Sequence, residues 1–397
     1  MAHCSKPRVC VLTTSYPDYP GSYRGVFVWR AVHALIERGY EISVVTPKLF
    51  KRSEVFEQNG GERIYRFPFL SEEKLLVEYD RVPILRMTTY MLSGLFYCAR
   101  ITRKDRCRLI HAHFLIPAGL IAALVGRWWG IPIIVQAHGS DLTKYAKLNR
   151  WLARLTAFTA KHADHFIVVS DELSTILRQE FAVPPDKITV RSCGIDMAHF
   201  SPIPRNQARE LLNLPLEATL VLFVGSLIHR KGIDILLSAM AGVMKHDSRV
   251  RLIVVGEGPL RKQLGAQAQD LVIEKMVHFV GRKSNEELPI WYSAADMFVL
   301  PSLREGTPLA LLEALSCELP VIVSRAGGMP ELIADGKNGL LTDIGDPLDL
   351  EKQIRFLLGE PNLRRRFRDT ARDTVLRWGG IQEEIDTVEN LYRQFGL

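Results

Sequence analysis

The segment at residues 304–316, REGTPLALLEALS, carries the most specific chemical signal in the sequence. Thr307 is a favoured N-cap residue, and Pro308 is a favoured first residue of a helix. The third helical position is then Ala310, so no capping box occupies the amides of Leu309 and Ala310. Free N–H groups and the positive end of the helix dipole attract anions. The segment therefore predicts a binding site for a diphosphate.

Two carboxylates, Glu305 and Glu313, lie on either side of this predicted helix start. Glu313 is surrounded by leucines, and a carboxylate there needs a hydrogen-bonding partner such as a ribose diol. A glycosidase carboxylate pair is the competing interpretation. Eight helical residues would separate the two groups by about 12 Å. Retaining glycosidases hold their carboxyl groups about 5–5.5 Å apart, so we reject that interpretation.

A basic pair, Arg230 and Lys231, follows the strand-like run at 218–225 and precedes Gly232 and a helical stretch. Cations at the top of a strand suit a leaving diphosphate. An Arg–Lys pair is more often only solvated at a surface. The position of this pair in a strand-end loop favours the functional interpretation.

His138 ends the strand-like run at 131–138, beside Gly139, where a sugar can approach closely. A lone histidine is more often structural, and both interpretations stay open. Asp141 fits a turn or cap residue. Strand alternation puts the two imidazoles of HAH (111–113) on one face, but no third ligand lies nearby, so the sequence predicts no metal site.

Two glycine turns accompany these residues. VVGEGPLR (254–261) lacks the third glycine and the downstream acid of a dinucleotide fingerprint. SRAGGMPELI (324–333) follows a strand and opens a helix, where backbone can approach a donor. A purely structural turn is an equally good interpretation of either one alone.

Short β-branched runs alternating with helical stretches must position these residues. The runs lie at 8–14, 41–46, 109–113, 131–138, 165–170, 187–192, 218–225, 249–256, 276–281, 296–302 and 319–324. Nearly continuous apolar runs are typical of parallel strands buried on both faces. The pattern predicts an α/β protein with two doubly wound, Rossmann-like domains whose strand-end loops face a central cleft. We expect these domains at 1–200 and 201–379, and a helix at about 380–397 is a candidate to pack back on the first.

The composition is globular, with 47% hydrophobic and 24% charged residues. Six cysteines form no C-x-x-C pair and fit neither a zinc site nor a disulfide framework. No apolar run has the length of a membrane span or the layout of a signal peptide. We therefore expect a cytoplasmic protein with reduced thiols.

Positive charge is concentrated in the first half of the chain. Residues 1–200 carry 27 Lys and Arg against 18 Asp and Glu, and the remainder carries 24 against 26. Segment 82–108 is apolar and ends in a basic cluster. It fits either a basic amphipathic helix on an anionic membrane or a core-packed helix with a solvated end. Without a nucleic-acid-binding motif, we expect no nucleic-acid partner and favour peripheral association with the inner face of the cell membrane.

Together these motifs resemble those of glycosyltransferase family 4, a large retaining group with the GT-B fold. The resemblance covers nearly the whole chain. It rests on SYP and GVFV (15–28), IPIIVQAHGSD (131–141), VGSLIHRKG (224–232), VGEGPL (255–260), the Glu305–Glu313 pair, and AGGMPELI with DGKNGLL (326–341).

We expect four catalytic residues: Glu305, His138 and Lys231, which the resemblance implies, and Arg230. Glu305 would contact hydroxyls of the donor sugar, Lys231 would hold the diphosphate, and His138 would lie beside the 6-hydroxyl of the sugar. Glu313 would bind the ribose.

We also expect a set of donor-binding residues, drawn partly from the predicted helix start and partly from the resemblance. They are Glu313, Gly306, Thr307, Pro308, Leu309, Ala310, Gly25, Gly225, Ser226, Gly281 and Arg282. Gly25 would lie near the phosphates, and Gly281 and Arg282 would line the base pocket. The family commonly has arginine where this chain has Ser226, and Arg230 is a candidate to supply that charge.

We therefore expect a retaining hexosyltransferase that moves a sugar from a UDP- or GDP-sugar to a glycan or lipid-linked acceptor. Its expected setting is surface polysaccharide biosynthesis, with no covalent enzyme intermediate and no metal or other cofactor. The competing interpretations are a sugar-nucleotide epimerase and a catalytically silent sugar-nucleotide-binding subunit. The joint presence of Glu305, Glu313, Lys231 and His138 argues against silence.

Overall fold

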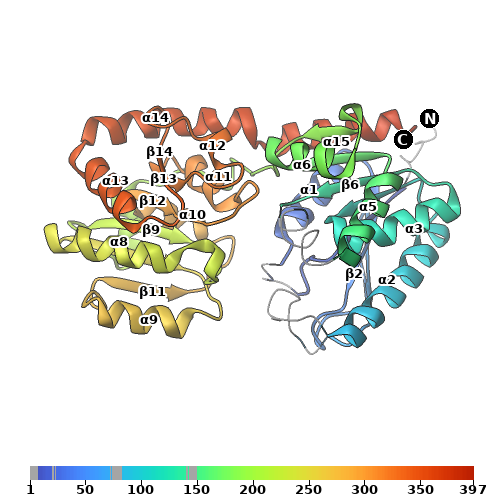
Figure 1. Ribbon diagram of the computed structural model, residues 1–397, viewed down its shortest axis with the longest axis horizontal. Coiled ribbons are helices and arrows are strands. Elements are labelled where there is room, and N and C mark those ends of the chain that lie inside the picture. The colour runs from blue at the N-terminus through green and yellow to red at the C-terminus, as the bar shows by residue number, and fades with distance from the viewer. Residues whose placement is uncertain are drawn as a thin grey trace. The chain divides into compact units, whose positions relative to one another are not determined.

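The chain folds into two compact units. The computed structural model describes residues 8–19, 22, 24–71, 73, 83–139, 142 and 150–397. Unit 1 comprises residues 1–194 and 381–397, and unit 2 comprises residues 195–380 (Figure 1). The division between Gly194 and Ile195 lies close to the boundary expected at 200, and the last helix belongs to unit 1.

Unit 1 is built on an eight-stranded sheet in the order β3-β4-β2-β1-β5-β6-β7-β8. The strands are β1 (Arg8–Thr13), β2 (Glu41–Pro47), β3 (Phe56–Asn59), β4 (Glu62–Phe67), β5 (Leu109–His113), β6 (Ile133–Ala137), β7 (His165–Val168) and β8 (Ile188–Val190). All neighbours are parallel except β3 and β4. The strand order reverses between β1 and β5. In doubly wound sheets, ligands bind outside the carboxyl ends of the strands at such a reversal.

Helices complete unit 1. They are α1 (Val26–Glu37), α2 (Ile84–Lys104), α3 (Leu120–Trp129), α5 (Arg150–His162), α6 (Asp171–Phe181) and α15 (Ile381–Gln394). Helix α15 buries Ile385 and Val388 in one apolar cluster with Val28 and Leu35 of α1. Its end is fixed by Tyr392, whose ring packs edge-on against Tyr40. Among the described residues, no helix is long and apolar enough to cross a membrane.

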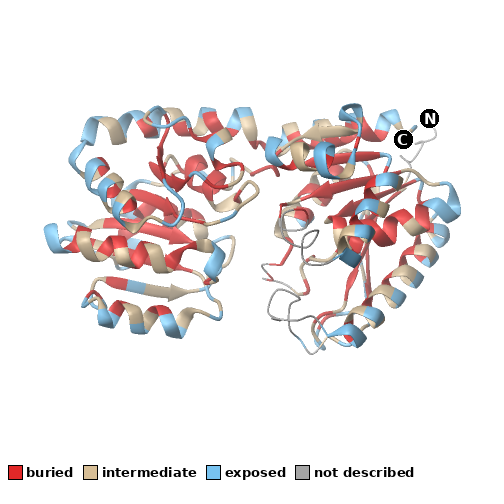
Figure 2. Ribbon diagram, in the orientation of Figure 1, coloured by how far each residue is buried: buried red, intermediate tan, exposed pale blue. Residues whose placement is uncertain are grey.

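Unit 2 contains a six-stranded parallel sheet in the order β11-β10-β9-β12-β13-β14. The strands are β9 (Thr219–Val224), β10 (Val250–Val255), β11 (Val277–Gly281), β12 (Met297–Leu300), β13 (Val321–Ser324) and β14 (Leu340–Thr342). The helices are α7 (Arg205–Leu211), α8 (Ile233–His246), α9 (Arg261–Asp270), α10 (Leu288–Ala294), α11 (Leu309–Ser316), α12 (Met329–Leu332), α13 (Pro347–Gly359) and α14 (Pro361–Trp378). The order reverses between β9 and β12, and the interior strands are buried (Figure 2).

Three strands were not predicted from the sequence: β3, β4 and β14. Strand β6 is also shorter than the run predicted at 131–138, because it ends at Ala137 and leaves His138 as the first residue after the strand. A histidine that follows the strand takes no part in its backbone hydrogen-bond ladder. Its ring position therefore depends on side-chain partners.

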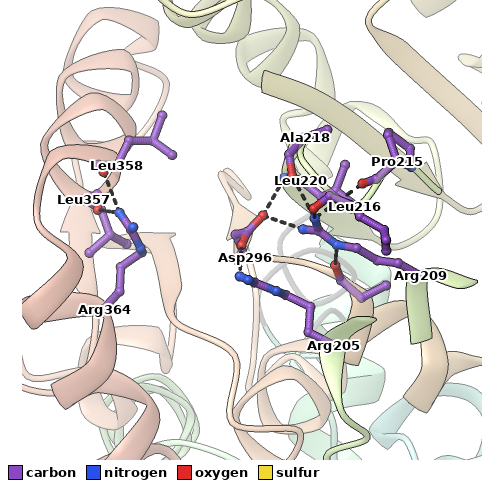
Figure 3. Close-up of polar contacts among 11 residues, drawn as sticks. Arg205, Arg209, Pro215, Leu216, Ala218, Leu220, Asp296, Leu357, Leu358 and Arg364 are labelled. Carbon is purple, nitrogen blue, oxygen red and sulfur yellow. Dashed lines mark hydrogen bonds and ion pairs between the residues drawn. The ribbon is translucent and has the colours of Figure 1, made fainter. Parts of the chain in front are cut away.

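A buried arginine of α7, Arg209, links this helix by hydrogen bonds to residues that precede two strands of the sheet in unit 2 (Figure 3). The side chain of Arg209 is 1% exposed and donates to the carbonyl oxygens of Ala294, Ala218 and Leu216 at 2.9, 2.8 and 2.6 Å. It also pairs with Asp296 at 2.7 Å. Because the guanidinium satisfies loop carbonyls that precede β9, it supports the strand whose end carries Lys231. In the same figure, Arg364 caps the end of α13.

Replacing this arginine is expected to destabilise unit 2. Arg209→Met should lower the free energy of unfolding by about 2–3 kcal/mol, because buried carbonyls lose a charged donor while Asp296 keeps Arg205. The matched control is Arg205→Met, since Arg205 pairs with the same carboxylate but is 45% exposed. It should cost less than about 1 kcal/mol. Denaturant unfolding measures both variants, and equal losses would contradict the role assigned to Arg209.

Candidate active site

Two loops meet at the strand-order reversal of unit 2. The loop after β9 carries Arg230 and Lys231, and the loop after β12 carries Glu305. Lys231 donates through Nζ to Oε1 of Glu305, and Arg230 lies 3.3 Å from Oε2 of the same carboxylate. Ser302 donates to Oε1 at 2.7 Å. The structure therefore brings three of the four predicted catalytic residues into one cluster.

The carboxylate is the buried centre of this cluster. The side chains of Glu305, Lys231 and Arg230 are 5%, 12% and 47% exposed. Burial alone raises the pKa of Glu305, but the charges of Lys231 and Arg230 and the hydrogen bonds from Lys231 and Ser302 outweigh it and hold the pKa below its usual value. The carboxylate is therefore ionised at neutral pH. Two cations around one carboxylate leave the cluster with a net positive charge.

Backbone contacts hold the loops in place. The amide of Leu303 donates to the carbonyl of Arg230 at 2.8 Å. Gly232 and Gly327 have φ of 62° and 57°, in the left-handed region that favours glycine. A Cβ at Gly232 would overlap the carbonyl of Pro301, and one at Gly327 would overlap the carbonyl of Glu305. These glycines allow the close approach that positions Glu305.

The helix after Glu305 begins one residue later than predicted. Helix α11 starts at Leu309, and Pro308 is its N-cap, with an extended ψ of 122°. Thr307 is therefore not the N-cap, and Leu309 rather than Pro308 is the first helical residue. No side chain caps the start of α11. The feature that matters for an anion, an uncapped helix start at Leu309 and Ala310, is present.

Gly306 and Glu313 lie on either side of this helix start. The carbonyl of Gly306 accepts from the amide of Gly328 at 2.9 Å, which ties the loop to the AGGMPELI turn. Glu313 is buried, and the hydroxyl of Tyr292 donates to its Oε2 at 2.8 Å. We expected a ribose to form the hydrogen bond that this carboxylate requires. In the structure, a tyrosine that had not been singled out from the sequence supplies one.

The remaining predicted residues of unit 2 occupy neighbouring strand ends. Gly225 follows β9, and Ser226 is exposed at the start of the loop that carries Lys231. Gly281 ends β11 and accepts from the amide of Gly256 at 2.8 Å. Arg282 is exposed directly after it. Because β11 is an edge strand, Gly281 and Arg282 are two strands away from β9.

Gly25 and His138 lie in unit 1. Gly25 is the N-cap of α1, where no side chain caps the helix. Phe27, in the first turn of α1, packs edge-on against His138 with ring centroids 4.8 Å apart. The first turn of α1, which follows β1, and the residue after β6 are therefore in contact. Asp141 lies outside the described residues.

Histidines form a buried row beside His138. The rings of His111 and His113 are stacked 4.7 Å apart, as strand alternation predicted. The Nδ1 of His113 lies 3.2 Å from Nε2 of His138. Burial, with a contribution from His111, lowers the pKa of His138 to about 3, so its ring is neutral at neutral pH. The part of the chain that the structure describes contains no group of three His, Cys, Asp or Glu side chains able to hold a metal ion.

The residues that contact the predicted ones but were not singled out from the sequence include Ser302, Tyr292, Phe114 and Cys193, which carry no local signal. His113 was considered only as a metal ligand, and that role was rejected. Ser302 is three residues from Glu305, whereas Cys193 reaches His138 from 55 residues away. Only the fold brings such distant residues together.

Comparison with known proteins identifies the family. Residues 25–199 match the model described as Glycosyltransferase Family 4, and residues 204–374 match that of glycosyl transferases group 1. The D-inositol 3-phosphate glycosyltransferase of Thermobispora bispora is 30% identical over 370 residues, which cover 88% of this chain and 85% of that protein. The chain belongs to glycosyltransferase family 4. The expected resemblance is thus confirmed, and the protein is a glycosyltransferase.

Solved structures confirm the GT-B fold of this family 4 glycosyltransferase. Sucrose-phosphate synthase from Thermosynechococcus elongatus matches with a TM-score of 0.82 and 22% identity, over 98% of this chain and 99% of that one. Alr3699/HepE from Anabaena, solved in complex with UDP-glucose, matches with a TM-score of 0.77 and 18% identity, over 98% and 99% of the two chains.

Proposed function

We propose that this glycosyltransferase transfers a hexose from a UDP- or GDP-sugar to a glycan or lipid-linked acceptor with retention of configuration, in surface polysaccharide biosynthesis. The observation that carries the proposal is the cluster of Lys231, Arg230 and Glu305 at the strand-order reversal of unit 2. Its net positive charge and the uncapped start of α11 suit a leaving diphosphate. The complex of the Anabaena protein with UDP-glucose supports a nucleotide-sugar donor.

In the proposed reaction, the bond between the anomeric carbon and the diphosphate oxygen breaks while the acceptor hydroxyl forms the new bond on the same face. Lys231 and the amides of Leu309 and Ala310 stabilise the charge that develops on the diphosphate. The departing phosphate oxygen takes the proton of the acceptor hydroxyl. His138 lies beside the transferred sugar, and Glu313 binds the ribose.

The state of Glu305 supports a route without a covalent enzyme intermediate. Its oxygens already accept from Lys231 and Ser302 and lie beside Arg230. A carboxylate with a lowered pKa and several donors is a weak nucleophile. The geometry therefore suits a residue that positions sugar hydroxyls and Lys231 better than one that attacks carbon.

The test is donor binding followed by product analysis. A UDP- or GDP-sugar at a hundredfold excess over its Kd should stabilise the protein by about 2.7 kcal/mol, which a thermal-shift screen detects. The preferred donor should then give an α-linked product from an α-linked donor. Epimerised donor, or binding without transfer to any acceptor, would contradict the proposal.

Transfer is expected to need no divalent metal, because Lys231 and the start of α11 supply the charge that a metal would otherwise provide. EDTA should change the rate by less than about twofold, or under ~0.5 kcal/mol. Lost activity that returns with added magnesium or manganese would overturn this expectation.

We also propose that unit 1 associates peripherally with an anionic membrane such as the inner face of the cell membrane. Helix α2 buries one face, with Tyr90, Cys98 and Ile101, and exposes Leu92 and Phe96. Its exposed end adds basic side chains beside Trp129 of α3. We define the aromatic–basic surface as Leu92, Phe96, Arg100, Arg103, Lys104 and Trp129.

The geometry of this surface suits lipid headgroups. Arg103 lies over the ring of Trp129, 4.9 Å from its centroid, and a hollow there is lined by Phe96 and Arg100. Tryptophan and basic side chains side by side are typical of interfacial elements, with apolar bodies toward lipid and charges toward phosphates. The structure thus shows a helix that is both packed on the core and amphipathic.

Vesicle flotation tests the surface. Binding should require anionic lipid and weaken with salt. Arg100→Gln with Arg103→Gln should weaken binding roughly thirtyfold, at about 1 kcal/mol for each basic residue. Arg365→Gln with Arg368→Gln, on the exposed side of α14, makes the same change in net charge and should leave binding unchanged. Binding that ignores lipid charge, or falls equally in both variants, would contradict this surface.

A further inference from the structure

Both ring nitrogens of His138 are occupied by protein partners. Its Nε2 lies 3.2 Å from Nδ1 of His113, and the two ring planes are within 10° of parallel. Its Nδ1 lies 3.4 Å from Sγ of Cys193. Phe27 and Phe114 flank the ring, each with its centroid 4.8 Å away. The imidazole therefore has two polar partners and two aromatic neighbours.

Only two arrangements of protons satisfy both hydrogen bonds of His138, the one with His113 and the one with Cys193. A neutral imidazole carries one N–H donor and one acceptor nitrogen. In the first arrangement His113 donates to Nε2, and Nδ1–H of His138 donates to the sulfur of Cys193. In the second, Nε2–H of His138 donates to His113, and the thiol of Cys193 donates to Nδ1. In both arrangements, the nitrogen of His138 that carries the proton is coupled to whether His113 donates or accepts.

Close packing alone does not account for His113. Its side chain is 3% exposed, and an imidazole buried without a polar partner is costly. A leucine would fill the same strand position without that cost. The polar partner of Nδ1 is His138, the one histidine of the row that lies beyond its strand.

We propose that His113, assisted by Cys193, is a positioning residue that fixes the ring orientation and tautomer of His138. The inference rests on the proposed function, which places His138 beside the transferred sugar. With both ring nitrogens engaged, His138 meets the sugar through a ring face or edge of fixed orientation. Binding through a ring nitrogen would require it to leave one of these partners.

The experiment compares His113→Leu with His113→Asn. Asparagine places an amide near the position of Nδ1 and can donate or accept, whereas leucine can do neither. Partners that orient a functional histidine typically contribute roughly ten- to hundredfold to activity. We expect His113→Leu to lower kcat by about that factor with little change in the KM of the donor, and His113→Asn to restore most of it.

A control and a second measurement separate this role from core packing. His165 is also buried, with Thr189 as its partner 2.8 Å away on the neighbouring strand. In the sheet register it pairs with Ile134, four residues before His138. His165→Leu should affect thermal stability but not kcat at a temperature where the variant is folded. Nitrogen-15 NMR of labelled histidines should show one tautomer of His138 in the wild type and in His113→Asn, and a changed proton distribution in His113→Leu.

The outcomes distinguish the two proposals. If His138→Ala keeps full activity, the placement of His138 at the sugar is wrong, and the NMR measurement still tests the tautomer. If His138→Ala loses activity but His113→Leu behaves like His165→Leu in rate, the positioning role is overturned. An unchanged His138 tautomer in His113→Leu would overturn it as well.

Discussion

Lys231→Ala is expected to lower turnover by about two to three orders of magnitude. Removal of one preorganised charge from a site of developing negative charge typically costs about 10²–10³ in kcat. Lys231 is well placed for such a role because it is 12% exposed and paired with an ionised Glu305. Steady-state kinetics at saturating donor measure the loss. Lys245→Ala, an exposed lysine of α8, should stay within about twofold.

A double variant separates chemistry from folding in this experiment. Lys231→Ala removes the closest cation from a carboxylate that is 5% exposed and leaves Arg230 and Ser302 beside it, and this also lowers stability. Adding Glu305→Gln removes that charge, so the double variant should regain thermal stability without regaining turnover. If turnover returned together with stability, Lys231 would be a structural partner of Glu305 rather than a ligand of the diphosphate.

Arg230→Ala is expected to lower turnover about tenfold. A charge-assisted contact to the diphosphate is worth about 1.5–3 kcal/mol, or tens- to a hundredfold. The lower end applies because Arg230 is 47% exposed and water screens its charge. Arg304→Ala is the matched control, since Arg304 is exposed in the loop that carries Glu305. It should change the rate by less than about twofold.

The exposed Ser226 provides a rescue test for Arg230. Ser226 lies in the loop after β9, at the position where the resemblance leads us to expect arginine. Ser226→Arg should partly restore the Arg230→Ala enzyme and do little on its own, because the two positions would supply the same charge. An unaffected Arg230→Ala enzyme would remove Arg230 from the site. Failure of the rescue alone would show that Ser226 is not an equivalent position.

The apolar runs of the sequence were sufficient to predict most of the architecture. Runs such as TLVLFV of β9 are buried on both faces, and that pattern is hard to mistake. Strand β3 was not predicted because FEQN is short and polar, and its pairing with β4 depends on tertiary context rather than on local preference. The helix start was misplaced by one residue for a similar reason. In the loop before the helix, Gly306 accepts a hydrogen bond from the amide of Gly328, and the backbone of Glu305 lies close to Gly327. These contacts outweigh the local preference for Thr307 as the N-cap residue.

The sequence was sufficient to predict which residues form the candidate site, but not which of them contact one another. Sequence position placed Lys231 and Glu305 at strand ends, yet they are 74 residues apart, and nothing local indicated that one would neutralise the other. Lys231 and Glu305 come into contact because β9 and β12, the strands that precede their loops, are neighbours at the centre of the sheet. The same holds for His138, whose partners come from β5 and from the residues after β8.

Helix α15 gives this chain a particular order of assembly on the ribosome. In the sequence, unit 2 is inserted between the two segments of unit 1, and an isolated bridge joins its first and last residues, Ile195 and Gly380. All of unit 2 is therefore synthesised before α15 emerges. Until then, the apolar surface of α1 that Ile385 and Val388 cover stays open, in a species prone to association. Nascent unit 1 is thus incomplete while unit 2 already has every residue it needs, so a chaperone that shields exposed apolar surface would act on the first half of the chain rather than the second.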